Sequence, residues 1–246
     1  MLSPDDLSVW VPSRSRAPQA AALLRGPLPT ATIVVAEDEY ATYVQQGVAP
    51  DHLTTHPNVF GLSRIRNWIV RHSPTVVTVQ VDDDFRCFHG MTGRRPRIIT
   101  DPDSILMVFY ATAVVAQEAG AHLFGYGDAL RPLYYKPDRP FSMTEVVDQV
   151  IGVIGKDVLW DDRLIMKGDT DATLRELLLR RIVWVDNRLA PNCGKMFQNK
   201  GGLQDIRTNK LREADIRLIE EKWGDAVECR KRNKNGSSVN RILVKR

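Results

Sequence analysis

The feature that most constrains the fold is a run of β-branched residues that ends in three consecutive acids. Thr75–Val81 reads Thr-Val-Val-Thr-Val-Gln-Val, and Asp82, Asp83 and Asp84 follow it directly. A short β-branched run of this kind predicts a strand rather than a helix. In an open α/β sheet, ligands bind at the carboxyl ends of the strands. We therefore expect an α/β protein with a functional site where this strand ends.

The three acids predict a metal site. Asp82 and Asp84 project to the same side if the extended geometry continues past Val81, because successive side chains of a strand alternate. Two converging carboxylates repel each other unless a cation lies between them, and hard oxygen ligands suit Mg²⁺ or Mn²⁺ shared with substrate phosphates. A charged strand end followed by a turn is the alternative interpretation.

Strands and helices alternate along the first half of the chain. We expect strands at 8–11, 32–36, 59–60 and 75–81, and helices at 18–25, 39–46 and 62–71. This repeated βαβ pattern predicts a mostly parallel sheet with right-handed crossovers. Residues 1–100 are therefore expected to form a nucleotide-binding half, and residues 101–206 the other half of the same domain.

The second half is less regular. We expect helices at 102–118, 172–180 and 209–223, and strands at 121–126, 150–154, 182–185 and 239–244. Residues 233–238 have the composition of a hairpin turn.

Composition points to an ordinary soluble protein, with 43% hydrophobic and 26% charged residues. No apolar run reaches the ~18 residues needed to span a bilayer, and the first residues do not resemble a secretory signal. Cys87, Cys193 and Cys229 lie far apart in the sequence, which favours a reducing cytoplasm over a disulfide framework or a structural zinc site. We expect a cytoplasmic protein with no membrane partner.

The net charge of +4 is unevenly distributed. Residues 207–246 carry 12 Lys and Arg against 6 Asp and Glu. The densest basic cluster is Arg230, Lys231, Arg232 and Lys234. A basic extension of this kind indicates a polyanionic partner, nucleic acid above all, although a solvated surface has the same composition.

Polar residues follow the first two expected strands. Arg14, Ser15 and Arg16 follow the first strand, and guanidinium groups at a helix start suit a diphosphate or a nucleobase edge. Glu37 follows the second strand and is able to accept hydrogen bonds from ribose hydroxyls. An exposed basic loop and simple helix capping are the respective alternatives.

Two further clusters suit the same chemistry. Ser63, Arg64 and Asn67 are expected on the face of helix 62–71 that points away from the core, where they would complement a metal-bound diphosphate; a solvated face is the alternative. Lys200 and Gly201 lie in a glycine-containing segment that suits an anion, or simply a tight turn.

Asp169 and Asp171 lie in a loop before an expected helix. One carboxylate suffices to cap a helix, so the second is available for another task. Asp169 is our candidate for the general base that accepts the proton of an attacking hydroxyl. Asp171 is the candidate for the cap or for a sugar contact.

The order of these blocks resembles a known family. Val11–Ala17, Gly61–Asn67 and Val81–Phe85 resemble the signature blocks of GT-A-type glycosyltransferases. Asp161–Asp171 and Asn199–Gly202, leading to Ile206–Thr208, are similar to the TET-associated glycosyltransferases of bacteriophages, relatives of the vertebrate GREB-type domain.

The resemblance implies a GT-A-like α/β fold and transfer of a sugar from a nucleotide-sugar, with a UDP-sugar as the expected donor, to 5-hydroxymethylcytosine or a related hydroxymethylpyrimidine in phage duplex DNA. It implies metal binding by Asp82 and Asp84, with Asp169 as the acidic residue of the later motif. In this sequence Gly168 stands where the family has an acid before that aspartate. The general base is therefore either Asp169 or Asp171. Donor contacts are expected at Pro12, Ser13, Arg14, Arg16, Glu37, Ser63, Arg64, Asn67, Asp83, Lys200 and Gly201, and DNA contacts at Arg230, Lys231, Arg232 and Lys234. The cytoplasm would be that of the bacterial host if the chain is phage-encoded.

Two alternatives stay open at this point. One is a GT-A transferase that acts on a small molecule or a glycan. The other is a non-catalytic nucleic-acid-binding module on a degenerate transferase fold. A metal-dependent nuclease would also combine acids with a basic patch, but no nuclease motif is present.

Overall fold

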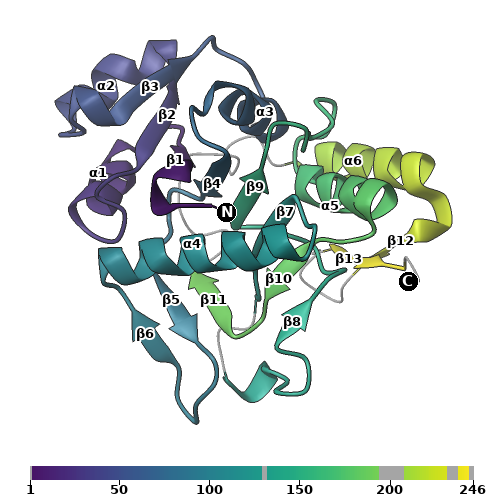
Figure 1. The fold of residues 1–246 in the computed structure, drawn as a ribbon. Helices are drawn as coiled ribbons and strands as arrows, with labels where there is room; N and C mark the ends of the chain where they lie inside the picture. Colours follow the sequence, from purple (N-terminus) through teal and green to yellow (C-terminus); the bar gives the residue numbers. More distant parts are fainter. Residues whose placement is uncertain (1, 129–131, 194–207, 232–237, 244–246) are drawn as a thin grey trace.

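The computed structural model describes residues 2–128, 132–193, 208–231 and 238–243. An eight-stranded sheet runs through its centre in the order β3-β2-β1-β4-β9-β7-β10-β8 (Figure 1). The strands are β1 (Leu7–Pro12), β2 (Thr32–Ala36), β3 (Leu53–His56), β4 (Val77–Val81), β7 (Leu123–Tyr126), β8 (Phe141–Ser142), β9 (Val150–Ile154) and β10 (Trp184–Asp186). The first four neighbours are parallel, whereas β9 runs antiparallel to both β4 and β7, and β8 antiparallel to β10.

Helices cover both faces of the sheet because the strand side chains are apolar on both sides. On one face, α1 (Ala17–Arg25) and α4 (Pro102–Glu118) pack against Val9, Val11 and Val79. On the other face lie α3 (Leu62–His72) and α5 (Gly168–Arg180), next to Trp10 and Ile151. Alternation along β1 sends Val9 and Trp10 to opposite sides. Figure 1 shows α4 crossing in front of the sheet. The short helix α2 (Tyr40–Gln45) packs against α1.

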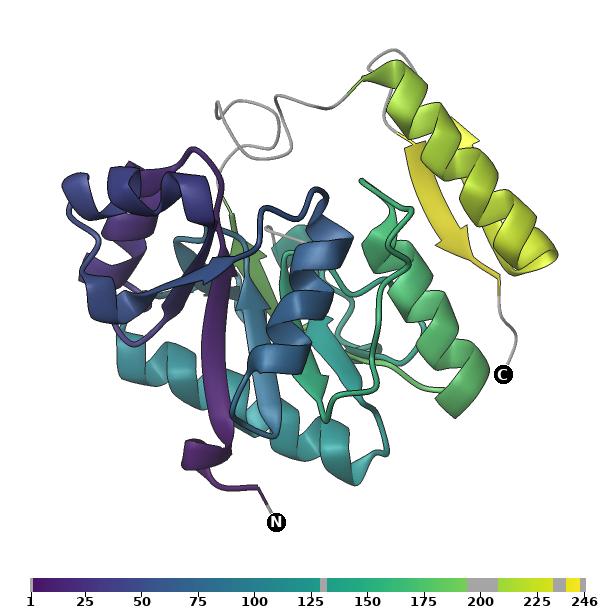
Figure 2. The ribbon, with the colours of Figure 1, turned by 90° about the horizontal axis from the view of Figure 1, so that it is seen from above.

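Two smaller units complete the described part of the chain. A three-stranded antiparallel sheet has the order β11-β5-β6, from Leu189–Asn192, Cys87–Gly90 and Arg97–Ile99. Helix α6 (Asn209–Trp223) and the antiparallel pair β12 (Val227–Lys231) and β13 (Ser238–Ile242) lie beside α5 (Figure 2). Short 3-10 turns occur at Pro4–Asp6, Glu37–Glu39, Pro50–His52, Pro132–Tyr134 and Gly224–Ala226. Within the described ranges, every helix is too short or too polar to cross a membrane.

The expected fold class is confirmed: the sheet is mostly parallel and is flanked by helices. Four elements have the expected bounds, namely β2, α4, β9 and α6. The strand expected at 59–60 is wrong, because the third strand is Leu53–His56. That strand is at the edge of the sheet and only partly buried, so it lacks the apolar run that marks β4. Residues 233–237 of the expected hairpin turn lie outside the described residues.

Candidate active site

The carboxyl ends of three parallel neighbours bring the expected site residues to one edge of the sheet. β1 ends at Pro12, β2 ends just before Glu37, and β4 ends just before Asp82. β9 runs the other way, so its amino end, preceded by Asp148, meets the carboxyl end of β4. Chain segments far apart in the sequence therefore converge on this edge.

The acidic triplet forms a turn rather than an extension of β4. The Asp82 carbonyl accepts a hydrogen bond from the Phe85 amide at 3.1 Å, and the Asp82 amide donates to the Gln149 carbonyl at 3.1 Å. The expectation that strand alternation carries Asp82 and Asp84 to one side is therefore wrong in its premise. Asp82 and Asp84 are partly exposed, whereas Asp83 between them is buried.

Asp83 fastens the loop after β1 to this turn. Its carboxylate receives Arg16 Nη1 at 2.7 Å and Ser13 Oγ at 2.9 Å. Ser13 Oγ also lies 2.8 Å from the Tyr43 hydroxyl of α2. Burial raises the pKa of Asp83, and the Arg16 guanidinium opposes that shift. Three residues expected to bind the donor thus lie together and hydrogen-bond to one another.

Other expected donor contacts are exposed. Arg14, Glu37 and Arg64 are all open to solvent, and the Arg14 guanidinium lies 5.7 Å from the centre of the Phe60 ring. Pro12 is buried at the end of β1. The structure leaves Arg14, Glu37 and Arg64 accessible to a ligand.

A buried arginine that we did not expect links the acids. Arg66 of α3 is 1% exposed, with Nη2 3.3 Å from Asp82 and Nε 3.4 Å from Asp169. The amphipathic pattern of α3 predicted that its apolar stripe faces inward and its polar face outward, yet Ser63, Arg66 and Asn67 of the polar face are buried. That expectation is wrong because the polar side chains on this face form hydrogen bonds and ion pairs with the acidic site and with the segment before α5.

Asp148 is a second unexpected member of the acidic group. Desolvation raises the pKa of Asp148 to about 7, and the nearby Asp169 and Asp82 carboxylates add to the shift. Desolvation likewise raises the pKa of Asp82 to about 7, with Arg66 opposing the shift and Asp169 adding to it. Because 37% of the Asp82 side chain is exposed, water screens part of this effect. Burial, and then the carboxylates of Asp82, Asp84 and Asp148, also raise the pKa of the Cys193 thiol.

Ser63 and Asn67 hold the segment that leads into α5. Ser63 Oγ donates to the Leu164 carbonyl at 2.7 Å. Asn67 Nδ2 donates to the Trp160 carbonyl at 2.8 Å and to Asp162 at 2.7 Å, and its Oδ1 accepts from the Trp160 amide at 2.8 Å. Both side chains, expected to contact the donor, are 3% exposed and occupied by these bonds.

The two acids of α5 have different surroundings. Asp169 is 25% exposed, and its Oδ1 accepts from Trp160 Nε1 at 3.2 Å. Asp171 is 1% exposed, and its Oδ1 receives Lys222 Nζ at 2.7 Å and Trp223 Nε1 at 2.8 Å from α6. The cap expected of Asp171 is wrong, because α5 begins at Gly168 after Lys167, with no side-chain cap of its own.

Gly168 explains why this helix starts so close to α3. A Cβ atom at Gly168 would lie 2.3 Å from Ser63 Oγ and 3.1 Å from Trp160 Cδ1. Any larger residue would push the first turn of α5 away from α3. Glycine at this position therefore allows Asp169 to approach Arg66 and Asp82.

Some expected residues are not described. Lys200, Gly201, Arg232 and Lys234 lie outside the described residues, and for Arg230 and Lys231 only the backbone, in β12, is described. Among the described residues, no group of three or more His, Cys, Asp or Glu side chains is arranged to hold a metal ion by itself. The two-residue metal site at Asp82 and Asp84 stays a prediction.

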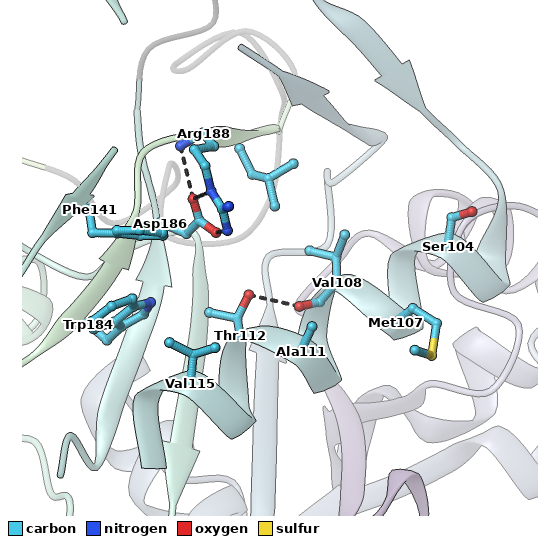
Figure 3. A pocket seen from close by; sticks show the side chains of 11 residues that line it. Ser104, Met107, Val108, Ala111, Thr112, Val115, Phe141, Trp184, Asp186 and Arg188 are labelled. Carbon is cyan, nitrogen blue, oxygen red and sulfur yellow. Dashed lines mark hydrogen bonds and ion pairs between the residues drawn. The ribbon is translucent and has the colours of Figure 1, made fainter. Parts of the chain in front are cut away.

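A pocket of about 450 Å³ lies elsewhere, between α4 and the strands β8 and β10 (Figure 3). Its wall includes Trp184, Asp186 and Arg188, and the last two form an ion pair at 2.7 Å. None of the expected site residues lines it.

Comparison with solved structures identifies the fold. The S. aureus TarS 1-349 structure in complex with UDP-GlcNAc matches with a TM-score of 0.53 and 14% identity over 89% of this chain and 66% of that one. The chain has the GT-A fold. A second S. aureus TarS structure matches with a TM-score of 0.50, 12% identity, and coverage of 89% and 40%. The mannosyltransferase PcManGT from Pyrobaculum calidifontis, in complex with GDP-Man and Mn²⁺, has a TM-score of 0.47 and 11% identity, over 74% of this chain and 54% of that one.

This GT-A chain therefore spans between 40% and 66% of the length of these three structures. No family model matches the sequence, and no curated protein matches it.

Proposed function

We propose that this protein is a metal-dependent glycosyltransferase that moves a sugar from a UDP-sugar to the hydroxymethyl group of 5-hydroxymethylcytosine, or a related hydroxymethylpyrimidine, in phage DNA. Residues 1–100 would bind the donor, residues 101–206 would receive the acceptor, and residues 207–246 would contact DNA. The observation that carries the proposal is the convergence of Asp82 and Asp169 on one buried arginine, at the carboxyl edge of a GT-A sheet.

The chemistry of the acidic edge fits a divalent cation. Asp82 and Asp84 supply hard oxygen donors. Burial and then the neighbouring carboxylates raise the pKa of Asp82, and an added cation would favour its charged form. In this proposal Asp82 and Asp84 hold Mn²⁺ or Mg²⁺. The ion would supply charge neutralisation for the diphosphate that leaves the sugar.

Asp169 is the base in this proposal. Its Oδ1 is held by Trp160 and Arg66, while its carboxylate is one-quarter exposed and so is able to meet an acceptor hydroxyl. Asp171 is assigned no contact with the acceptor, because it is fully buried against Lys222 and Trp223.

Donor binding is assigned to the exposed groups at the same edge. Arg14, Glu37 and Arg64 are exposed, whereas Ser63 and Asn67 are buried and occupied by internal hydrogen bonds, so the three exposed residues are the donor contacts that we favour. Asp83 would act by holding Ser13 and Arg16 in place. Lys200 and Gly201 remain candidates from sequence alone, and the UDP moiety is suggested by the UDP-GlcNAc bound to TarS.

The DNA acceptor rests on the sequence. The later motifs are similar to those of the phage enzymes, and residues 207–246 carry an excess of positive charge that would offset the repulsion between protein and phosphate. Arg230, Lys231, Arg232 and Lys234 are the proposed phosphate contacts.

The deciding experiment incubates the protein with Mn²⁺, a panel of nucleotide sugars and duplex DNA containing either 5-hydroxymethylcytosine or cytosine, and then weighs the nucleosides. We expect a hexose-sized or similar mass increase on the hydroxymethylated base only. Asp82→Asn and Asp84→Asn should abolish it, whereas Asp103→Asn, an exposed acid on α4, should not. Donor hydrolysis without DNA modification would indicate the small-molecule or glycan alternative, and DNA retention without any donor turnover would indicate the non-catalytic one.

A further inference from the structure

Helix α6 binds the backbone just before helix α5. Asp215 of α6 is 3% exposed, and its Oδ2 accepts from three consecutive backbone amides in the segment that leads into α5. The donors are Ile165 at 3.0 Å, Met166 at 2.6 Å and Lys167 at 3.1 Å. Two of these amides belong to the loop before α5, and the third belongs to Lys167, the residue directly before the first residue of the helix. A carboxylate from another helix therefore holds the backbone that leads into α5.

The same face of α6 holds the first turn of α5 at a second place. Lys222 lies seven residues after Asp215, on the same side of the helix, and reaches Asp171 at 2.7 Å and Asp161 at 3.0 Å. Trp223 donates to Asp171 as well. Between these two contacts, Ile219 packs against Leu164 and Leu174. α6 thus contacts the segment 161–171 at two polar sites with an apolar contact between them.

Asp169 lies within the segment that α6 contacts. It lies two residues after Lys167 and two before Asp171, and on its other side it meets Arg66 and Trp160. If the amides at 165–167 lost their acceptor, this segment and the helical turn that follows it would loosen, because unpaired amides favour any conformation that reaches water. The carboxylate of Asp169 would then lose its place relative to Asp82.

We propose that Asp215 is a positioning residue for Asp169, so that α6 belongs to the active site rather than only to a DNA-binding extension. The inference rests on the proposed function for its catalytic consequence. The hydrogen bonds of Asp215 to these amides can be tested without any substrate.

The test compares Asp215→Ala with wild type and with Glu220→Gln, which removes an exposed acid from the same helix. Hydrogen exchange at the amides of 165–167 is measured first, and donor turnover second. We expect exchange at these amides to be at least about tenfold faster in Asp215→Ala. We expect kcat to fall by about 100-fold with the donor KM within about twofold of wild type. Glu220→Gln should match wild type in both measurements.

Asp215→Asn keeps one carbonyl oxygen as an acceptor but loses the charge, so it serves if the alanine variant fails to fold. Its kcat should fall by about tenfold, between wild type and the alanine variant. Faster exchange with unchanged kcat would overturn the positioning role, and unchanged exchange would show that Asp215 does not hold these amides. A wild-type protein that turns over no nucleotide sugar would refute the proposed function, and the positioning role of Asp215 in catalysis with it, while the exchange data would still decide whether Asp215 holds the amides.

Discussion

Asn67 offers the sharpest test of what the polar face of α3 does. The sequence motif suggests that this amide contacts the donor, whereas the structure has it bonded to the backbone of Trp160 and to Asp162. A donor contact predicts a change in KM when Asn67 is replaced. An internal tie predicts a loss of folding stability.

The size of that loss follows from the contacts. Asn67→Ala removes three hydrogen bonds of 2.7–2.8 Å in a site where the side chain is 3% exposed. At about 1 kcal/mol for each bond, the free energy of unfolding should fall by about 3 kcal/mol. The penalty is not recovered by water, because the amide and carbonyl of Trp160 stay in the interior.

Urea unfolding followed by circular dichroism measures this change. For a slope of about 3 kcal/mol/M, the midpoint should shift by about 1 M. Arg64→Ala, an exposed neighbour on the same helix, should stay within about 0.5 kcal/mol of wild type. A midpoint for Asn67→Ala that equals wild type, together with a raised donor KM, would refute the structural role.

Three further variants probe the same region. Gly168→Ala should lower the free energy of unfolding by about 1–3 kcal/mol, since its Cβ would lie 2.3 Å from Ser63 Oγ. In a urea titration, the double variant with Ser63→Ala should recover part of this loss. Strictly additive effects of the two substitutions would contradict the clash. Lys222→Met should lower the free energy of unfolding by about 3 kcal/mol, because it leaves the buried Asp171 carboxylate without its cation. Lys210→Met, on the exposed side of α6, should leave the free energy of unfolding unchanged in the same titration. In the absence of metal, the melting temperature should fall as the pH rises from about 4 to about 7, because the raised pKa values of Asp82 and Asp148 let the folded state hold protons that the unfolded state has released. Asp148→Asn should make this fall smaller. A melting temperature that depends on pH in the same way in Asp148→Asn and wild type would show that Asp148 does not titrate in this range.

The strands and helices with a single clear pattern were predictable from sequence. β2, β9 and α4 are continuous apolar runs with turn residues or a cap at their ends, and no tertiary contact is needed to read them. Asp101 caps α4 through the Ser104 amide, which is a local signal. The placement of Asp82 at the end of β4 follows from the same reasoning.

The polar half of the site was not predictable in this way. Arg66 can be buried because Asp82 and Asp169, from two other elements, pair with its charge. Asp148 lies near these two carboxylates only because β9 runs antiparallel to β4. The backbone just before α5 is held by Asp215, nearly fifty residues farther along the chain. Signals of this kind belong to the assembled structure, because a helical period cannot tell a buried polar face from a solvated one.

Cys193 lies beside the acidic turn, where burial and nearby carboxylates raise the pKa of its thiol. A thiol with a raised pKa is a poor nucleophile towards peroxide or alkylating reagents, so the sulfur atom at this edge of the sheet should react slowly with them. Inactivation by thiol reagents would accordingly have to be sought at another cysteine.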